Sequence, residues 1–190
     1  MFASALDIHQ FSRNNKSISD IRKFNLTTMS NSVKEGNTVE AVLFIITDKN
    51  ILYIQLDIEA AIKMKCSPLD QVQPILETLS TKKEFRNINA YQVIAEAWMK
   101  TFHDNEGEAP IAYGDIALMP NRIEVLMESF IEKNNDPKHR VFEMIRKIDS
   151  NKLMELKEIF VLDETKQDDS SDYLQSEKFP SLPIKGDIEN

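Results

Sequence analysis

The sequence predicts a single α+β domain, in which two principal helices pack on a mainly antiparallel sheet of about five to six strands. Three observations predict it: a hairpin pattern around Asp48-Lys49-Asn50, a helical apolar pattern on each side of that hairpin, and a later series of β-rich runs. The predicted domain spans 17–162, after an N-terminal arm at 1–16 and before an acidic tail at 163–190 that is expected to be disordered.

The first predicted helix covers 18–35. Ser17 stands at the N-cap position with Asp20 three residues later, which is the spacing of a capping box. Apolar residues then recur at helical spacing, and Gly36 stands where a helix C-cap is expected. The arm before it, at 1–16, is polar with a mixed pattern, so it is expected to be a loose arm or a short strand.

The hairpin is predicted from two β-rich runs, 38–47 and 51–56, on either side of the short polar turn. The first run is apolar on both faces, and we therefore expect it at the centre of the sheet, covered on both sides.

A second helix is expected within 68–83. Ser67-Pro68 supplies an N-cap followed by proline at the first helical position. Pro74 falls inside the apolar pattern, so the helix is expected to kink or to begin near Gln73. A helical turn is also possible over 57–65.

The second half of the domain is predicted to be strands. The run 89–102 contains the single tryptophan, and 122–133 and 140–148 surround a short turn. These last two runs also partly fit a helix, but the short turn and the alternation in 122–132 favour strands. The apolar segment 153–162 is expected to add an edge strand.

The tail carries much of the negative charge. Residues 163–190 contain eight acids and three lysines, within a chain of net charge −8. Apolar residues spaced by prolines in this acidic context resemble a docking peptide for a protein partner, although a tail that packs on its own domain, or on nothing, fits as well. The residues of this predicted docking peptide are Tyr173, Leu174, Phe179, Leu182 and Ile184.

Composition and charge exclude several classes of function. The chain lacks the basic stripe that a general grip on nucleic acid needs, so nucleic-acid binding is not expected. It has neither a signal peptide nor an apolar run long enough to span a membrane, and Cys66 is its single cysteine. We therefore expect a cytoplasmic protein without membrane association. No cofactor is expected, since the phosphate-binding glycine patterns do not occur. The absence of paired His or Cys motifs likewise predicts no metal.

Glu96 is the most informative candidate residue. It lies in an apolar strand two residues before Trp98, and an unpaired buried carboxylate costs several kcal/mol. Arg122 and Glu124 share a face of the next predicted strand, so Arg122 is expected to reach Glu96. This cluster of four residues is interpreted first as a buried ion pair that fixes strand register. A ligand site or a catalytic acid or base at Glu96 is the alternative.

The segment Glu96-Ala97-Trp98-Met99, with the later Pro120-Asn121-Arg122-Ile123-Glu124, resembles a family of small uncharacterised α/β proteins. Those proteins pair an EAWM strand with a PxRxE motif that opens the next strand. The resemblance covers 18–148 and implies this order of helices and strands, without implying an activity. The long acidic end of this chain departs from the family pattern.

These observations predict a non-enzymatic binding or assembly protein that acts as a homo-oligomer, because no catalytic signature occurs and the last strand offers an open sheet edge. The alternative is a small enzyme that uses Glu96 as general acid or base in a pocket walled by Trp98. No catalytic residue is assigned on the first interpretation.

Overall fold

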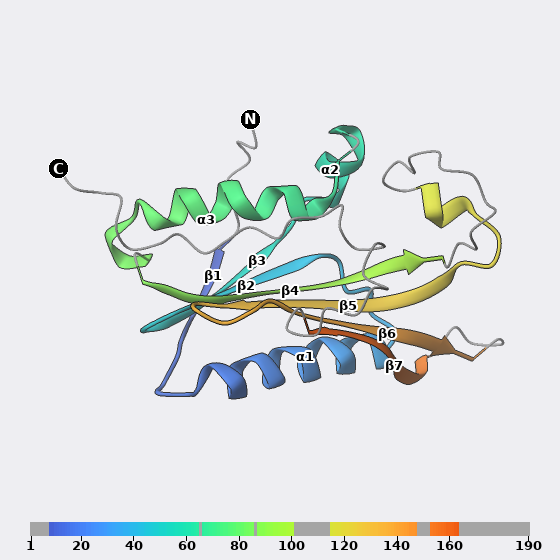
Figure 1. Ribbon diagram of the computed structural model, residues 1–190, viewed down its shortest axis with the longest axis horizontal. Coiled ribbons are helices and arrows are strands. Elements are labelled where there is room, and N and C mark those ends of the chain that lie inside the picture. Colours follow the sequence, from blue (N-terminus) through green and yellow to red (C-terminus); the bar gives the residue numbers. More distant parts are fainter. Residues whose placement is uncertain (1–7, 65, 86, 101–114, 148–152, 164–190) are drawn as a thin grey trace.

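The computed structural model describes residues 8–64, 66–85, 87–100, 115–147 and 153–163. Their strands form one antiparallel sheet of seven strands in the order β1-β3-β2-β4-β5-β6-β7, with helices on both faces (Figure 1). The strands are β1 Ile8–Ser12, β2 Val42–Thr47, β3 Asn50–Gln55, β4 Ile88–Met99, β5 Ile123–Glu132, β6 Lys138–Arg146 and β7 Leu153–Asp163. The helices are α1 Ile18–Lys34, α2 Ile58–Met64 and α3 Val72–Ser80.

The predicted α+β class is confirmed, but the strand count was too low. The sheet has seven strands where about five to six were expected. The additional strand is β1, which lies in the predicted N-terminal arm and pairs with β3 from Ile8 opposite Ile54 to Ser12 opposite Asn50. It was hard to recognise because it is short and largely exposed; Phe11 is 57% accessible. The tail at 164–190 lies outside the described residues.

Helix α1 begins and ends where the sequence predicts. The Ser17 hydroxyl accepts a hydrogen bond from the Asp20 backbone N–H at 3.0 Å, which satisfies one of the free donors of the first turn. After the helix, Gly36 adopts φ +90°, a conformation that costs a glycine little and other residues more. The helix lies along one face of the sheet (Figure 1).

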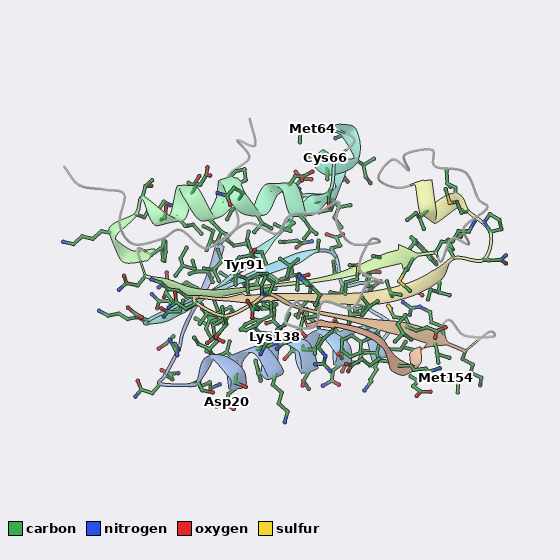
Figure 2. All side chains as sticks on the ribbon, viewed as in Figure 1. Asp20, Met64, Cys66, Tyr91, Lys138 and Met154 are labelled. Atoms are coloured by element: carbon green, nitrogen blue, oxygen red, sulfur yellow. The ribbon has the colours of Figure 1, made fainter. Side chains whose placement is uncertain are left out.

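The β2–β3 hairpin forms as predicted, and β2 is buried along its whole length. Its side chains alternate between two apolar layers. Leu43 and Ile45 pack in the layer that contains the apolar face of α3, whereas Val42 and Phe44 pack with Val33 in the layer beneath α1. Figure 2 shows Tyr91 of β4, which is fully buried between the sheet and α3.

The second predicted helix is divided into a 3₁₀ turn at Pro68–Gln71 and α3. Ser67 and Asp70 form a reciprocal capping box at its start. Pro74 is the third residue of α3 and therefore lies in the first turn, where a missing N–H removes no intrahelical hydrogen bond. The helix thus begins at Val72 and accommodates the proline.

The strands predicted in 122–133 and 140–148, which the short turn favoured over helices, are present as β5, Ile123–Glu132, and β6, Lys138–Arg146. Strands β4 and β5 pair over ten positions, from Ala90 opposite Glu132 to Met99 opposite Ile123. This long pairing positions the candidate residues of the two motifs relative to each other, since directly opposed residues share a face of the sheet.

Candidate functional site

The candidate residues lie on the α1 face, near the end of the β4–β5 ladder. Trp98 is directly opposite Glu124, and Glu96 is opposite Leu126 one step further in. Since Glu96 and Trp98 are two residues apart, their side chains project to the same side as that of Glu124. Three of the four residues predicted for this cluster therefore share one face of two neighbouring strands.

Arg146 of β6 is the cation that the carboxylates share. Its Nε and Nη2 donate to the two oxygens of Glu124, at 2.5 and 2.9 Å, in a bidentate pair. The same guanidinium lies 3.9 Å from Glu96 Oε2. Glu96 Oε1 accepts a hydrogen bond of 2.6 Å from the Val39 backbone N–H. The carboxylate of Glu96 thus joins β4 to β6 and to the chain that enters β2.

Arg122, the partner expected for Glu96, lies elsewhere. Its guanidinium is centred 4.6 Å from the Trp98 ring, and its Nη1 donates to the Met119 carbonyl at 3.0 Å. Arg122 precedes the first residue of β5, and the left-handed conformation of Asn121 (φ 59°) turns the chain just before it. Because Glu96 is opposite Leu126, the register places Arg122 four residues from the position opposite Glu96 and next to Trp98 instead. Trp98 remains 42% accessible, as one side of an exposed arginine–tryptophan stack.

Burial raises the pKa of the Glu96 carboxyl above its ordinary value, and the nearby Glu124 acts in the same direction. The hydrogen bond from Val39 and the charge of Arg146 oppose this rise. The pKa of Arg146 is raised, chiefly by its hydrogen bonds to Glu124. The arrangement is that of an ion-pair cluster in which one arginine serves two carboxylates.

We predict that Glu96→Gln costs less than about 1 kcal/mol in the free energy of unfolding. The amide oxygen can still accept a hydrogen bond from the Val39 N–H, and Arg146 keeps its ion pair with Glu124. Glu96→Ala leaves the Val39 N–H without that acceptor and is expected to cost about 1–3 kcal/mol. Urea unfolding of both variants at one protein concentration measures the difference. Equal losses for the two would show that the hydrogen bond to Val39 contributes nothing.

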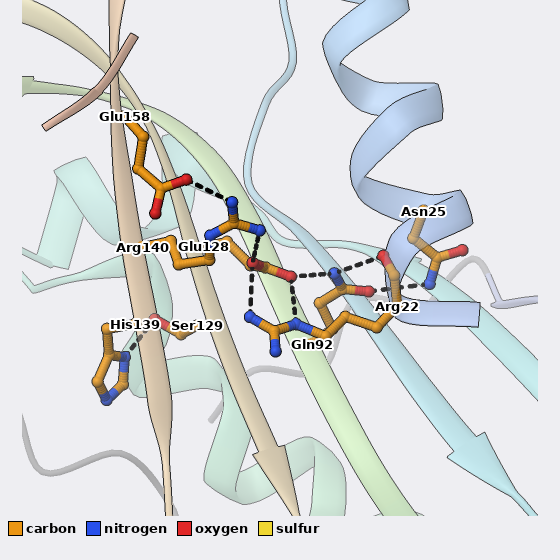
Figure 3. Close-up of polar contacts among 8 residues, drawn as sticks. All are labelled: Arg22, Asn25, Gln92, Glu128, Ser129, His139, Arg140 and Glu158. Atoms are coloured by element: carbon orange, nitrogen blue, oxygen red, sulfur yellow. Dashed lines mark hydrogen bonds and ion pairs between the residues drawn. The ribbon is translucent and has the colours of Figure 1, made fainter. Parts of the chain in front are cut away.

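A second polar cluster on the same face was missed by sequence reasoning. It centres on Glu128 of β5, whose side chain is 0% accessible. Arg22 of α1 donates from Nε and Nη2 to its two oxygens at 2.8 and 2.9 Å. Gln92 donates to Oε1 at 2.6 Å, and Arg140 lies 3.8 Å from Oε2 (Figure 3).

The outer members complete this network. Asn25 of α1 donates to the side-chain oxygen of Gln92 at 3.0 Å, and Arg140 pairs with Glu158 of β7 at 2.5 Å. Among the described residues, no buried side-chain nitrogen or oxygen lacks a hydrogen-bond partner. The cluster therefore connects α1 to four strands of the sheet, β4 to β7. Its charged groups form ion pairs with one another. The alternation Glu124, Leu126, Glu128 was the only signal in the sequence that could have indicated it.

A buried Ser129–His139 pair lies on the opposite face of β5 and β6. The two residues are directly opposed, and Ser129 Oγ lies 3.0 Å from His139 Nδ1. Burial lowers the pKa of His139 below its ordinary value, which favours the neutral ring. Sequence reasoning missed this pair because its two members are ten residues apart on different strands.

The predictions about metal binding, membrane association and the docking peptide concern other parts of the chain. Within the described ranges, no group of three or more His, Cys, Asp or Glu side chains could hold a metal ion. Nor does that part of the chain contain a helix that is both long and apolar enough to cross a membrane. The predicted docking peptide, Tyr173 to Ile184, lies outside the described residues.

Comparisons of this chain with protein-family models, with curated proteins and with solved structures found no match. The function is therefore inferred from the geometry of the described residues.

Proposed function

We propose that this protein is a non-enzymatic cytoplasmic binding or assembly protein that acts as a homo-oligomer. The observation that carries the proposal is the end of the sheet at β7. This strand of 11 residues pairs with β6 on one side, and no other strand of the described chain pairs with it on the other. The unpaired N–H and C=O groups of such an edge are a template for another strand.

The geometry at Glu96 supports a binding protein over the enzyme alternative. A general acid or base needs a carboxyl that can reach a substrate. The Glu96 carboxylate is instead engaged by the Val39 N–H and lies beside Arg146, and its side chain is 14% accessible. The raised pKa of its carboxyl follows from burial within this cluster. These contacts favour a role in holding strands together.

The exposed stack of Arg122 on Trp98 supports binding as well. Tryptophan and arginine are among the side chains most enriched in residues that dominate the energy of protein interfaces. Here they are already paired with each other, 4.6 Å from guanidinium to ring, at the edge of the α1 face. We propose this stack and the predicted docking peptide at 173–184 as the two elements that would contact a further protein partner.

Sedimentation velocity of the full chain at micromolar concentrations tests the proposal. We expect a species of twice the chain mass of 21.9 kDa, which dissociates on dilution. A monomer at all concentrations would contradict homo-oligomerisation. A monomer that becomes dimeric only when 164–190 is removed would contradict it too, since the tail and not a second copy would then cover the edge.

A further inference from the structure

The outer edge of β7 is regular over only part of its length. Two bulges interrupt its pairing with β6. Ile159 is an extra residue between Glu158 and Phe160, and Met154 is an extra residue between Leu153 and Glu155. Bulges twist an edge strand and disfavour further pairing at those points. A partner strand would therefore pair with the stretch from Glu155 to Glu158.

Symmetry restricts how two copies of this stretch can pair. Two identical edges join as antiparallel strands about a two-fold axis normal to the sheet. Residues that are directly opposite each other then lie on the same face. Because side chains alternate between the faces, the axis must lie midway between the two copies of one residue. Each residue of the regular stretch thus defines one register.

Charge distinguishes these registers. An axis at Glu155, Lys157 or Glu158 places that charged residue opposite its own copy, which is destabilising. An axis at Leu156 places leucine opposite leucine. It also places Glu155 of each copy opposite Lys157 of the other, so two opposite-charge pairs form by symmetry.

We propose that two copies of this protein pair through β7 about a two-fold axis at Leu156. This inference rests on the proposed homo-oligomeric function and names its interface. Leu156 is half-buried against the apolar layer beneath α1, whereas Glu155 and Lys157 are exposed on the other face. The paired sheets form one continuous sheet, with the α1 helices of both copies on the same face.

Charge reversal tests the register. Glu155→Lys and Lys157→Glu each replace two opposite-charge pairs by two like-charge pairs, and each is expected to weaken dimerisation about tenfold or more. The double variant restores opposite charges across the axis and is expected to recover the dimer. Lys157 also lies opposite Glu143 of its own chain, a neighbour that the second substitution does not correct. Recovery in the double variant therefore reports the contact between copies. Thermal unfolding of each variant checks that the monomer is intact.

Cysteine cross-linking provides the second measurement, in full chains that carry Cys66→Ser. Leu156→Cys is expected to form an intermolecular disulfide under mild oxidation, since the axis brings the two residues opposite each other. The matched control is Met154→Cys, an exposed position (67%) that the register separates from its copy. A dimer that shows neither charge rescue nor the Leu156→Cys cross-link overturns this interface and leaves the proposed function standing. A monomer at all concentrations overturns both.

Discussion

Replacing Arg22 by methionine is expected to lower the free energy of unfolding by about 3–5 kcal/mol, one of the two largest effects expected of a single substitution. Arg22 supplies both of the close hydrogen bonds from a charged group to Glu128. Without it, the fully buried carboxylate keeps Gln92 and an arginine 3.8 Å away. Breaking a buried ion pair from one side leaves a charge that water cannot reach.

Urea unfolding at fixed protein concentration measures this loss. The double variant Arg22→Met, Glu128→Leu removes both charges and is expected to recover at least half of it, because an apolar pair of similar volume replaces the ion pair. Glu158→Gln is the matched control. Its partly exposed carboxylate pairs with Arg140, and its loss is expected to cost less than about 1 kcal/mol. A double variant less stable than Arg22→Met would contradict this account of the cluster.

Replacing Arg146 by methionine is expected to cost about 2 kcal/mol at neutral pH, since Glu96 and Glu124 lose the cation they share. The loss depends on pH. Burial already raises the pKa of Glu96 above its ordinary value, and removing Arg146 raises it further. A carboxyl with a raised pKa in the folded state destabilises the fold above that pKa, and the cost disappears as pH falls through it.

The difference in unfolding free energy between the wild type and Arg146→Met should therefore shrink as pH is lowered from 7 toward the ordinary glutamate value of 4.5. Urea unfolding at several pH values measures it. The neighbouring exposed Lys147 offers a control, because Lys147→Met removes a cation that no carboxylate of the cluster uses. A cost for Arg146→Met that stays constant over this range would show that the two carboxylates do not depend on Arg146.

The sequence indicated most of the fold because local signals agreed with the final structure. The capping residues Ser17 and Ser67 mark the helices, and the polar turn after Thr47 marks the hairpin. Strand β1 was not assigned from its pattern because it gains its structure from β3 and carries little apolar alternation of its own.

The site was predictable only in part. Alternation placed Glu96, Trp98 and Glu124 on one face, and the register of β4 with β5 brings them together. The cation came from β6, two strands away, and the sequence contains no information on which of several arginines reaches Glu96. Arg122 is the partner that strand alternation suggests, but the register of β4 with β5 brings it to Trp98 and leaves Glu96 opposite Leu126. The Glu128 cluster depends on α1 packing over β4 and β5, an arrangement set by tertiary packing.

The central claim is that β7 is the surface by which copies of this protein associate. Amide hydrogen exchange of the full chain, measured across a range of protein concentrations, tests it most directly. Protection of the segment 155–158 is expected to increase with concentration, as its outer N–H groups bond to a second copy, while protection of the opposite edge strand β1 stays constant. Exchange in 155–158 that is independent of concentration, in a sample that sedimentation shows to be dimeric, would contradict the claim.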